Sequence, residues 1–132
     1  MSIIDKVKQL NLPLDEMVVI GSGLLDAYGL REANDLDIVV PEYTYRDLRL
    51  SGEYRVGMKH DEGYLYKDDI EVWRSWGTKA GKPNFKALKA DGVVIDGVTF
   101  VNPAFLIQMK QERGSDKDKA DIEMLEGYLN AN

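Results

Sequence analysis

Three short stretches of the sequence carry residue types that bind phosphate groups and divalent cations. A Gly-Ser-Gly sequence at residues 21–23 follows an apolar run, Asp35 and Asp37 flank a leucine farther along, and Glu71 lies between two apolar residues. Glycines let the backbone approach a phosphate closely, and free N–H groups at the start of a helix bind anions. Carboxylate oxygens are ligands that Mg²⁺ prefers. These residues suit chemistry on a phosphorylated substrate with a metal ion.

The spacing of the two aspartates brings them together if they lie in a strand. Side chains at positions i and i+2 of a strand share a face, so Asp35 and Asp37 lie opposite the apolar residues around them. Two carboxylates on one face repel each other, and Mg²⁺ is a natural compensating ion. If the Glu71 strand is a neighbour, three carboxylates meet and can anchor two metal ions. The sequence leaves open whether Glu71 or the nearby Asp68 or Asp69 is the third carboxylate.

Each stretch taken alone also has a plain structural interpretation. Residues 21–23 suit an ordinary turn with a serine helix cap, the two aspartates suit a solvated edge strand, and Glu71 suits an exposed strand position. The Gly-Ser-Gly sequence is not a P-loop, because no Lys-Ser or Lys-Thr follows it. It is not a Rossmann fingerprint either, because the third glycine is missing from its place. The order and spacing of all three stretches favour one site.

Composition narrows the class of protein. The 132 residues suit one domain, residues 1–132. The absence of cysteine excludes a disulfide framework and thiolate metal sites, and the single His60 excludes a multi-histidine zinc site within one chain. The net charge of -6 argues against long nucleic acids as partners. No apolar run is long enough for a membrane span and the first residues do not resemble a signal peptide, so we expect a cytoplasmic protein.

The elements that must position these residues follow from hydrophobic periodicity and turn signals. Helices are predicted at residues 3–10, 22–29, 42–50, 103–113 and 116–129, and strands at residues 17–20 and 36–40. One hairpin is predicted within residues 62–76 and a second within residues 92–101, where Asp96-Gly97 forms the turn. Between them, residues 75–85 suit a loop rich in glycine and lysine.

The end of the chain is predicted to be helical. Asn102 and Ser115 suit helix caps, and Pro103 suits a first helical position. The last helix is expected to bury one apolar stripe, formed by Ala120, Ile122, Leu125 and Leu129. The order of elements predicts an α+β (mixed α/β) domain, with a mixed sheet and helices on its faces or flanks.

The three stretches resemble the nucleotidyltransferase superfamily related to DNA polymerase beta. The similarity rests on Ile20-Gly21-Ser22, Asp35-Leu36-Asp37-Ile38 and Ile70-Glu71-Val72. The resemblance implies that Gly21 and Ser22 hold the phosphates of an NTP, and that Asp35 and Asp37 bind two Mg²⁺ ions. It makes Glu71 the third metal ligand or a catalytic base.

The last part of the chain adds to this resemblance. It is similar to the tail of small stand-alone nucleotidyltransferase-like proteins, which include abortive-infection toxins and some antibiotic-modifying enzymes. The matching positions are Lys110, Arg113, Lys117-Asp118 and Asp121. The resemblance implies that Lys110 contacts the nucleotide phosphates or the acceptor, and that Asp118 and Asp121 help to position the last helices. It spans residues 17–126 and departs from many members in its extra Gly23 and its short N-terminal part.

The resemblance implies the nucleotidyltransferase fold, a small mixed sheet with flanking helices and a C-terminal helical pair. We predict a Mg²⁺-dependent nucleotidyltransferase that moves a nucleoside monophosphate from an NTP such as ATP to a hydroxyl acceptor. The acceptor is a small molecule, a protein or an RNA end. The alternative is a catalytically inactive binding module or a toxin–antitoxin-type regulatory partner, and a further alternative gives the carboxylates a role in solubility only. A homodimer or a partner chain is expected if one chain does not complete the acceptor pocket.

Several other side chains have two interpretations. Trp73 shares a strand face with Glu71, and either stacks on a substrate ring or packs as a half-buried sheet residue. Lys79, Lys82 and Lys86 either contact a polyanionic acceptor or belong to a solvated loop. Trp76 is expected to be a packing or rim residue, and His60 a surface turn residue.

Overall fold

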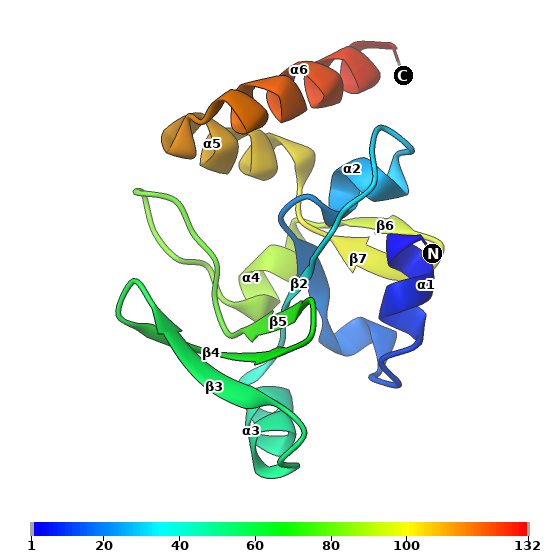
Figure 1. Cartoon of the computed structure of the whole chain (residues 1–132). Helices are drawn as coiled ribbons and strands as arrows, with labels where there is room; N and C mark the ends of the chain where they lie inside the picture. Colours follow the sequence, from blue (N-terminus) through cyan, green and yellow to red (C-terminus); the bar gives the residue numbers. More distant parts are fainter. Residues whose placement is uncertain (1, 132) are drawn as a thin grey trace.

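A mixed sheet organises residues 2–131, which the computed structural model describes. Its strands lie in the order β3-β4-β5-β2-β1-β7-β6 (Figure 1). Along the chain they are β1 (Val18–Ile20), β2 (Leu36–Val39), β3 (Arg55–Lys59), β4 (Glu62–Lys67), β5 (Ile70–Trp73), β6 (Val93–Ile95) and β7 (Val98–Phe100). The helices are α1 (Ile3–Lys8), α2 (Gly23–Ala27), α3 (Glu42–Leu50), α4 (Phe85–Ala90), α5 (Pro103–Arg113) and α6 (Asp116–Ala131). A short 3-10 helix, Leu14–Glu16, precedes β1.

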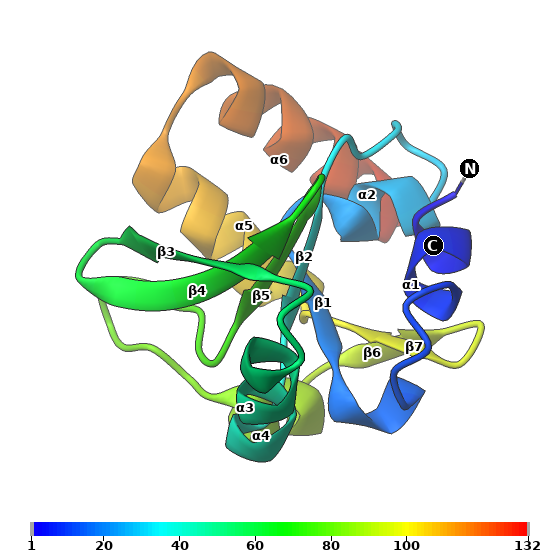
Figure 2. The ribbon, with the colours of Figure 1, turned by 60° about the horizontal axis from the view of Figure 1, so that its bottom comes forward.

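The central strands β1 and β2 form the middle of the core. All three residues of β1 are buried, and β2 is buried except at Asp37. Helices α1 and α2 cover one side of the sheet and α3 and α4 lie on the other (Figure 2), so these strands are apolar on both faces. This explains why β1 is a continuous apolar run rather than an alternating one.

The register of the central strands gathers three chain segments at one end of the sheet. β1 and β2 are antiparallel, with Ile20 opposite Asp37. β2 and β5 are parallel, with Asp37 opposite Glu71. The end of β1, the start of β2 and the start of β5 therefore lie together. The helical pair α5 and α6 packs beyond this end, on the side away from α3 (Figure 1).

Local signals of the sequence set several element ends as expected. Ser2 and Asn102 cap α1 and α5 through their side-chain oxygens, which accept from Asp5 N and Ala104 N. The hairpin of β6 and β7 turns at residues 96–97, where both residues have positive φ values of 51° and 81°. An Asp-Gly pair suits this turn because glycine adopts positive φ without strain. The α+β fold with a C-terminal helical pair is confirmed.

Two elements were not anticipated from the sequence. Strand β3 lies at the sheet edge, and its apolar side chains Val56 and Met58 are exposed, so no alternation of buried and exposed positions marks it. Helix α4 begins at the last residue of the expected loop and continues through a stretch for which no element was predicted; it is only six residues long and buries only Leu88. Elements this short carry too little periodicity to be recognised.

The predicted apolar stripe of α6 is wrong. Ala120 is exposed and Leu129 is 39% exposed, whereas the buried positions of this helix are Asp118, Asp121 and Leu125. Two of the three are carboxylates, and a search for apolar periodicity cannot find them. Among residues 2–131, no helix is long and apolar enough to cross a membrane.

Gly23, the extra glycine of the first motif, has a packing role. A Cβ at this position would lie 2.6 Å from Val19 Cγ1 and 3.3 Å from Ile3 Cγ1. The start of α2 therefore touches both β1 and α1, and only a residue without a side chain fits there.

We expect Gly23→Ala to lower the free energy of unfolding by about 1–3 kcal/mol, because the added methyl group overpacks the core. Gly127 in α6 provides a matched control, since a Cβ there meets nothing within 4 Å. Gly127→Ala should raise the free energy of unfolding by about 0.5–1 kcal/mol through helix propensity. Urea denaturation measures both, and equal effects of the two substitutions would contradict the packing role.

Candidate active site

The structure brings the Gly-Ser turn and two of the predicted carboxylates together. Gly21 follows β1 with a φ of +67°, and a Cβ at this position would lie 3.2 Å from Asp37 Oδ2. The turn backbone therefore runs directly past the Asp37 carboxylate. Glu71 lies beside Asp37 on the neighbouring parallel strand.

Asp37 is a half-buried carboxylate without a compensating partner. Within residues 2–131 it forms neither a hydrogen bond nor an ion pair. Burial raises the pKa of Asp37 to about 7, and the negative charges of Glu71 and Asp35 add to this effect. Lys59 and Arg113 oppose it. A cation bound beside Asp37 would remove this electrostatic cost.

Glu71 is already engaged by neighbouring side chains. Lys59 Nζ lies 2.9 Å from Glu71 Oε2, and Trp73 Nε1 donates to Glu71 Oε1 at 3.2 Å. Asp69 pairs with Lys6 at 2.9 Å, and the register of β2 and β5 sets Glu71 opposite Asp37. Asp35 is exposed and lies just before β2 rather than in it. No group of three or more His, Cys, Asp or Glu residues within 2–131 is arranged to hold a metal ion.

Ser22 does not cap α2 through its side chain. Its hydroxyl oxygen instead accepts from Arg31 Nη2 at 2.8 Å and from Lys110 Nζ at 3.4 Å. The serine cap considered from the sequence is therefore replaced by a link between the turn and two cationic side chains.

A buried ion-pair network holds these cations. Lys110 Nζ lies 2.9 Å from Asp121 Oδ2, and both side chains are 2% exposed. Arg31 donates to both oxygens of Asp121, at 2.7 and 2.8 Å. Burial raises the pKa of Asp121, but the hydrogen bonds from Arg31 and Lys110 outweigh it and leave the pKa below its ordinary value. The network joins α5, α6 and the loop before β2 to Ser22.

Arg113 extends this network toward Asp37. Its guanidinium donates to Asp118, which also accepts from the Ser115 hydroxyl at 2.6 Å. Hydrogen bonds from Arg113 hold the pKa of Asp118 well below its ordinary value, although burial opposes them. The Arg113 side chain is nevertheless 66% exposed and remains accessible to a ligand.

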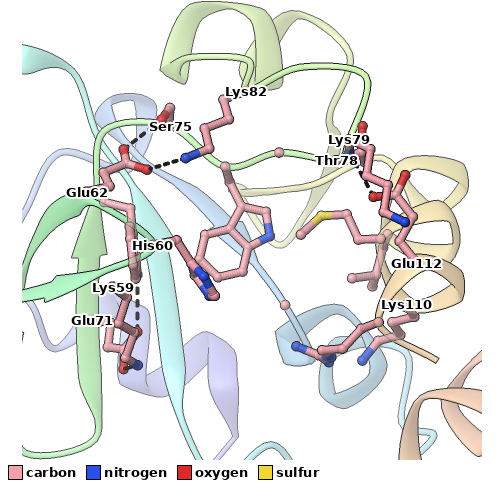
Figure 3. A pocket seen from close by; sticks show the side chains of 17 residues that line it. Lys59, His60, Glu62, Glu71, Ser75, Thr78, Lys79, Lys82, Lys110 and Glu112 are labelled. Atoms are coloured by element: carbon pink, nitrogen blue, oxygen red, sulfur yellow. Dashed lines mark hydrogen bonds and ion pairs between the residues drawn. The ribbon is translucent and has the colours of Figure 1, made fainter. Parts of the chain in front are cut away.

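A cavity of about 650 Å³ opens beside these groups. Lys59, Glu62 and Glu71 lie on one side of it, on the β3–β5 strands, and Lys110 and Glu112 face them from α5 (Figure 3). Gly21 contributes to the lining, as do Trp73, Trp76 and the residues of the 75–82 loop. The cavity therefore brings Gly21, Glu71 and Lys110 to one space, whereas Ser22, Asp35 and Asp37 are not among the residues that line it.

Comparison with known protein families finds no matching family, and comparison with curated proteins finds no match. Among solved structures, the crystal structure of ANT(2″)-Ia in complex with adenylyl-2″-tobramycin is similar, with a TM-score of 0.55 and 17% sequence identity. The similarity covers 98% of this chain and 87% of that chain. The chain has the nucleotidyltransferase fold. Within this fold, the strand register places the Gly-Ser turn, Asp37 and Glu71 at one end of the central strands.

Arg31 and Lys59 are site residues that the sequence did not reveal. Arg31 lies in a loop between α2 and β2, and Lys59 ends the unanticipated strand β3. Each reaches a carboxylate far away in the chain, so only the tertiary fold shows the pairing. Trp73 is 4% exposed and stacks on Tyr64 at 4.7 Å, as in the packing interpretation.

The raised pKa of Asp37 predicts a measurable dependence of stability on pH. Its pKa is about 7 in the folded chain and near the ordinary 3.8 in the unfolded chain, so the folded state binds the extra proton between these values. The free energy of unfolding should fall as pH rises from about 4 to about 7, by roughly 2–4 kcal/mol at most.

Asp37→Asn removes this titration, so we expect the variant to be more stable than the parent at pH 8 in the presence of a chelator. Urea denaturation across the pH range measures the difference between the two proteins. Asp47→Asn, at an exposed position of α3, is the control and should retain the parental slope. A parental slope in Asp37→Asn would show that Asp37 titrates normally.

Proposed function

We propose that this chain transfers a nucleoside monophosphate from an NTP to a hydroxyl acceptor. The observation that supports this most is the register that sets Asp37 beside Glu71 and the Gly21 backbone. Glu71, Lys110 and Arg113 line the same cavity as Gly21, so one of the proposed metal-binding carboxylates lies with cations suited to phosphate. The complex of ANT(2″)-Ia with adenylyl-2″-tobramycin suggests ATP as the NTP.

In this proposal the Gly-Ser turn and the C-terminal helices bind the triphosphate. The Gly21 backbone has no side chain between it and the cavity, and the Ser22 hydroxyl is held by Arg31 and Lys110. Lys110 is a buried point charge, and Arg113 is an exposed planar donor suited to phosphate oxygens. These groups orient the α-phosphorus toward the carboxylates.

The acceptor oxygen attacks the α-phosphorus, the bond to the β-phosphate oxygen breaks, and pyrophosphate leaves. The hydroxyl proton passes to a carboxylate. Asp37 is the better placed base, because Glu71 already holds Lys59 and Trp73. Positioning of the two substrates contributes most of the rate, as in other phosphoryl transfers.

The proposed Mg²⁺ site is centred on Asp37, and Asp35 and Glu71 would have to move to join it as further ligands, because the described residues 2–131 hold no ready group of three such acids. This assignment rests on the uncompensated charge at Asp37, which burial and the neighbouring acids make costly. When bound, two Mg²⁺ ions would activate the acceptor hydroxyl and offset charge on the leaving pyrophosphate. Lys59 must release Glu71 for this carboxylate to join the site.

The ion pair of Glu71 also favours a second candidate function. If Lys59 stays on Glu71, the chain binds an NTP through Gly21, Ser22 and Lys110 without turnover. It would then serve as a catalytically inactive nucleotide-binding module or as a toxin–antitoxin-type regulatory partner.

We expect Asp37→Asn to reduce nucleotidyl transfer at least about 100-fold, because the metal ligand and proton acceptor is neutralised. Pyrophosphate release with ATP and Mg²⁺ across a panel of hydroxyl acceptors measures this. Asp47→Asn should retain full activity. A fully active Asp37→Asn would rule out the metal assignment, and NTP binding with no turnover of any acceptor by the parent would favour the binding module.

Lys59→Gln should increase Mg²⁺ affinity about fivefold in the absence of nucleotide, since the competing ammonium group is worth about 1 kcal/mol. Isothermal titration calorimetry measures the affinity. Lys86→Gln removes the same charge from the exposed face of α4 and should leave Mg²⁺ affinity unchanged. Equal affinities of the two variants would show that Glu71 is not a metal ligand.

A further inference from the structure

The part of the cavity lined by Glu62 and by residues of the 75–82 loop has an unusual balance of hydrogen-bonding groups. Figure 3 shows Glu62, Ser75 and Lys82 on one side, with Thr78 and Lys79 beside Glu112 on the other. The lining of the whole cavity carries five cationic side chains and three carboxylates, although the chain has a net charge of -6. The cationic members are Lys59, Lys79, Lys82, Lys110 and Arg113.

All three carboxylates of the lining already accept from the chain itself. Glu71 holds Lys59 and Trp73. Glu62 accepts from the Ser75 hydroxyl at 2.7 Å and lies 3.6 Å from Lys82 Nζ. Glu112 accepts from Lys79 N at 2.8 Å. These contacts weaken the attraction of the three carboxylates for a ligand ammonium group, and each carboxylate keeps some acceptor capacity.

The groups that are left over in this part of the cavity are donors. The Trp76 indole nitrogen, Nε1, is buried and has no hydrogen-bond partner within residues 2–131. A buried N–H without an acceptor costs about 1–3 kcal/mol, so a ligand oxygen that meets this N–H after a rotation of the indole would be stabilising. The Lys79 ammonium group forms no ion pair within these residues, and Lys82 is 54% exposed beside its weak contact with Glu62.

We propose that this part of the cavity binds the acceptor, and that the acceptor is a small hydroxyl compound bearing a phosphate or carboxylate group. The inference rests on the proposed nucleotidyl transfer. Trp76 donates to an oxygen of the acceptor, while Lys79 and Lys82 attract its anionic group. A polyamine such as an aminoglycoside is disfavoured, because it brings ammonium groups to a lining with five cationic side chains and three carboxylates that already accept from the chain.

The geometry favours a small molecule over a nucleic acid. The hydrogen bond from Lys79 N to Glu112 connects the 75–82 loop to α5 and restricts the cavity on that side. A cavity of about 650 Å³ lies in the size range of small-molecule sites. The acidic chain would also repel a long polyanion.

The chain contains two tryptophans, so its indole N–H signals in a ¹⁵N–¹H spectrum report directly on Trp73 and Trp76. Trp76→Phe assigns them. The protein is first saturated with α,β-methylene ATP and Mg²⁺, which fills the nucleotide site and tests the proposed function separately. Ribose 5-phosphate, ribose, tobramycin and a single-stranded RNA oligonucleotide are then titrated in parallel.

We expect ribose 5-phosphate to shift the Trp76 signal with an affinity about tenfold higher than that of ribose or tobramycin. Lys79→Glu should weaken ribose 5-phosphate about tenfold, whereas Lys86→Glu, with the same change of charge outside the cavity, should not. Tighter binding of tobramycin, binding of RNA alone, or no shift with ribose 5-phosphate would overturn the acceptor class while nucleotide binding stands. Absence of binding by α,β-methylene ATP would instead overturn the proposed function.

Discussion

The buried contact between Lys110 and Asp121 is the interaction on which the site depends. Both side chains are almost fully removed from solvent, and each would be costly to bury alone. Together with Arg31 they connect the C-terminal helical pair to the Gly-Ser turn at the other end of the sequence. The network adds directional contacts to the apolar packing of Leu106 and Leu125 in the core, and so fixes the helices that form one side of the cavity.

The carboxylates on the helical side of the site have cationic or hydroxyl partners, whereas Asp37 on the strand side has none within residues 2–131. On the helical side each buried carboxylate has a cation or hydroxyl within hydrogen-bond distance, so Asp118 and Asp121 stay ionised. On the strand side Asp37 has no such partner, and burial with two acids nearby makes its charged form unfavourable. A stable scaffold therefore surrounds one unsatisfied carboxylate. Such local cost is common where a ligand or metal ion supplies the missing charge.

Signals within a few neighbouring residues predicted much of this fold. The ion pairs between residues distant in the sequence could not be predicted from such signals. The Gly-Ser turn, the two central strands and the cap at Asn102 are encoded within a few residues each. The buried face of α6 was misread because its aspartates are stabilised by Lys110, a contact that no periodicity reveals. The nearness of Asp37 and Glu71 followed from the resemblance, whereas the ion pair of Glu71 with Lys59 requires the register of β3 and β4.

The similarity to ANT(2″)-Ia concerns the fold, and the fold alone does not select an acceptor. An acceptor is recognised by the polar groups that the chain leaves unpaired at the cavity. In this chain each carboxylate of the cavity lining already accepts from a donor of the chain, while Trp76 Nε1 has no hydrogen-bond partner within residues 2–131. The same scaffold with unpaired glutamates would present the opposite preference. In the proposed site, acceptor class would therefore depend on which carboxylates the surrounding strands and loop have already paired, rather than on how many are present.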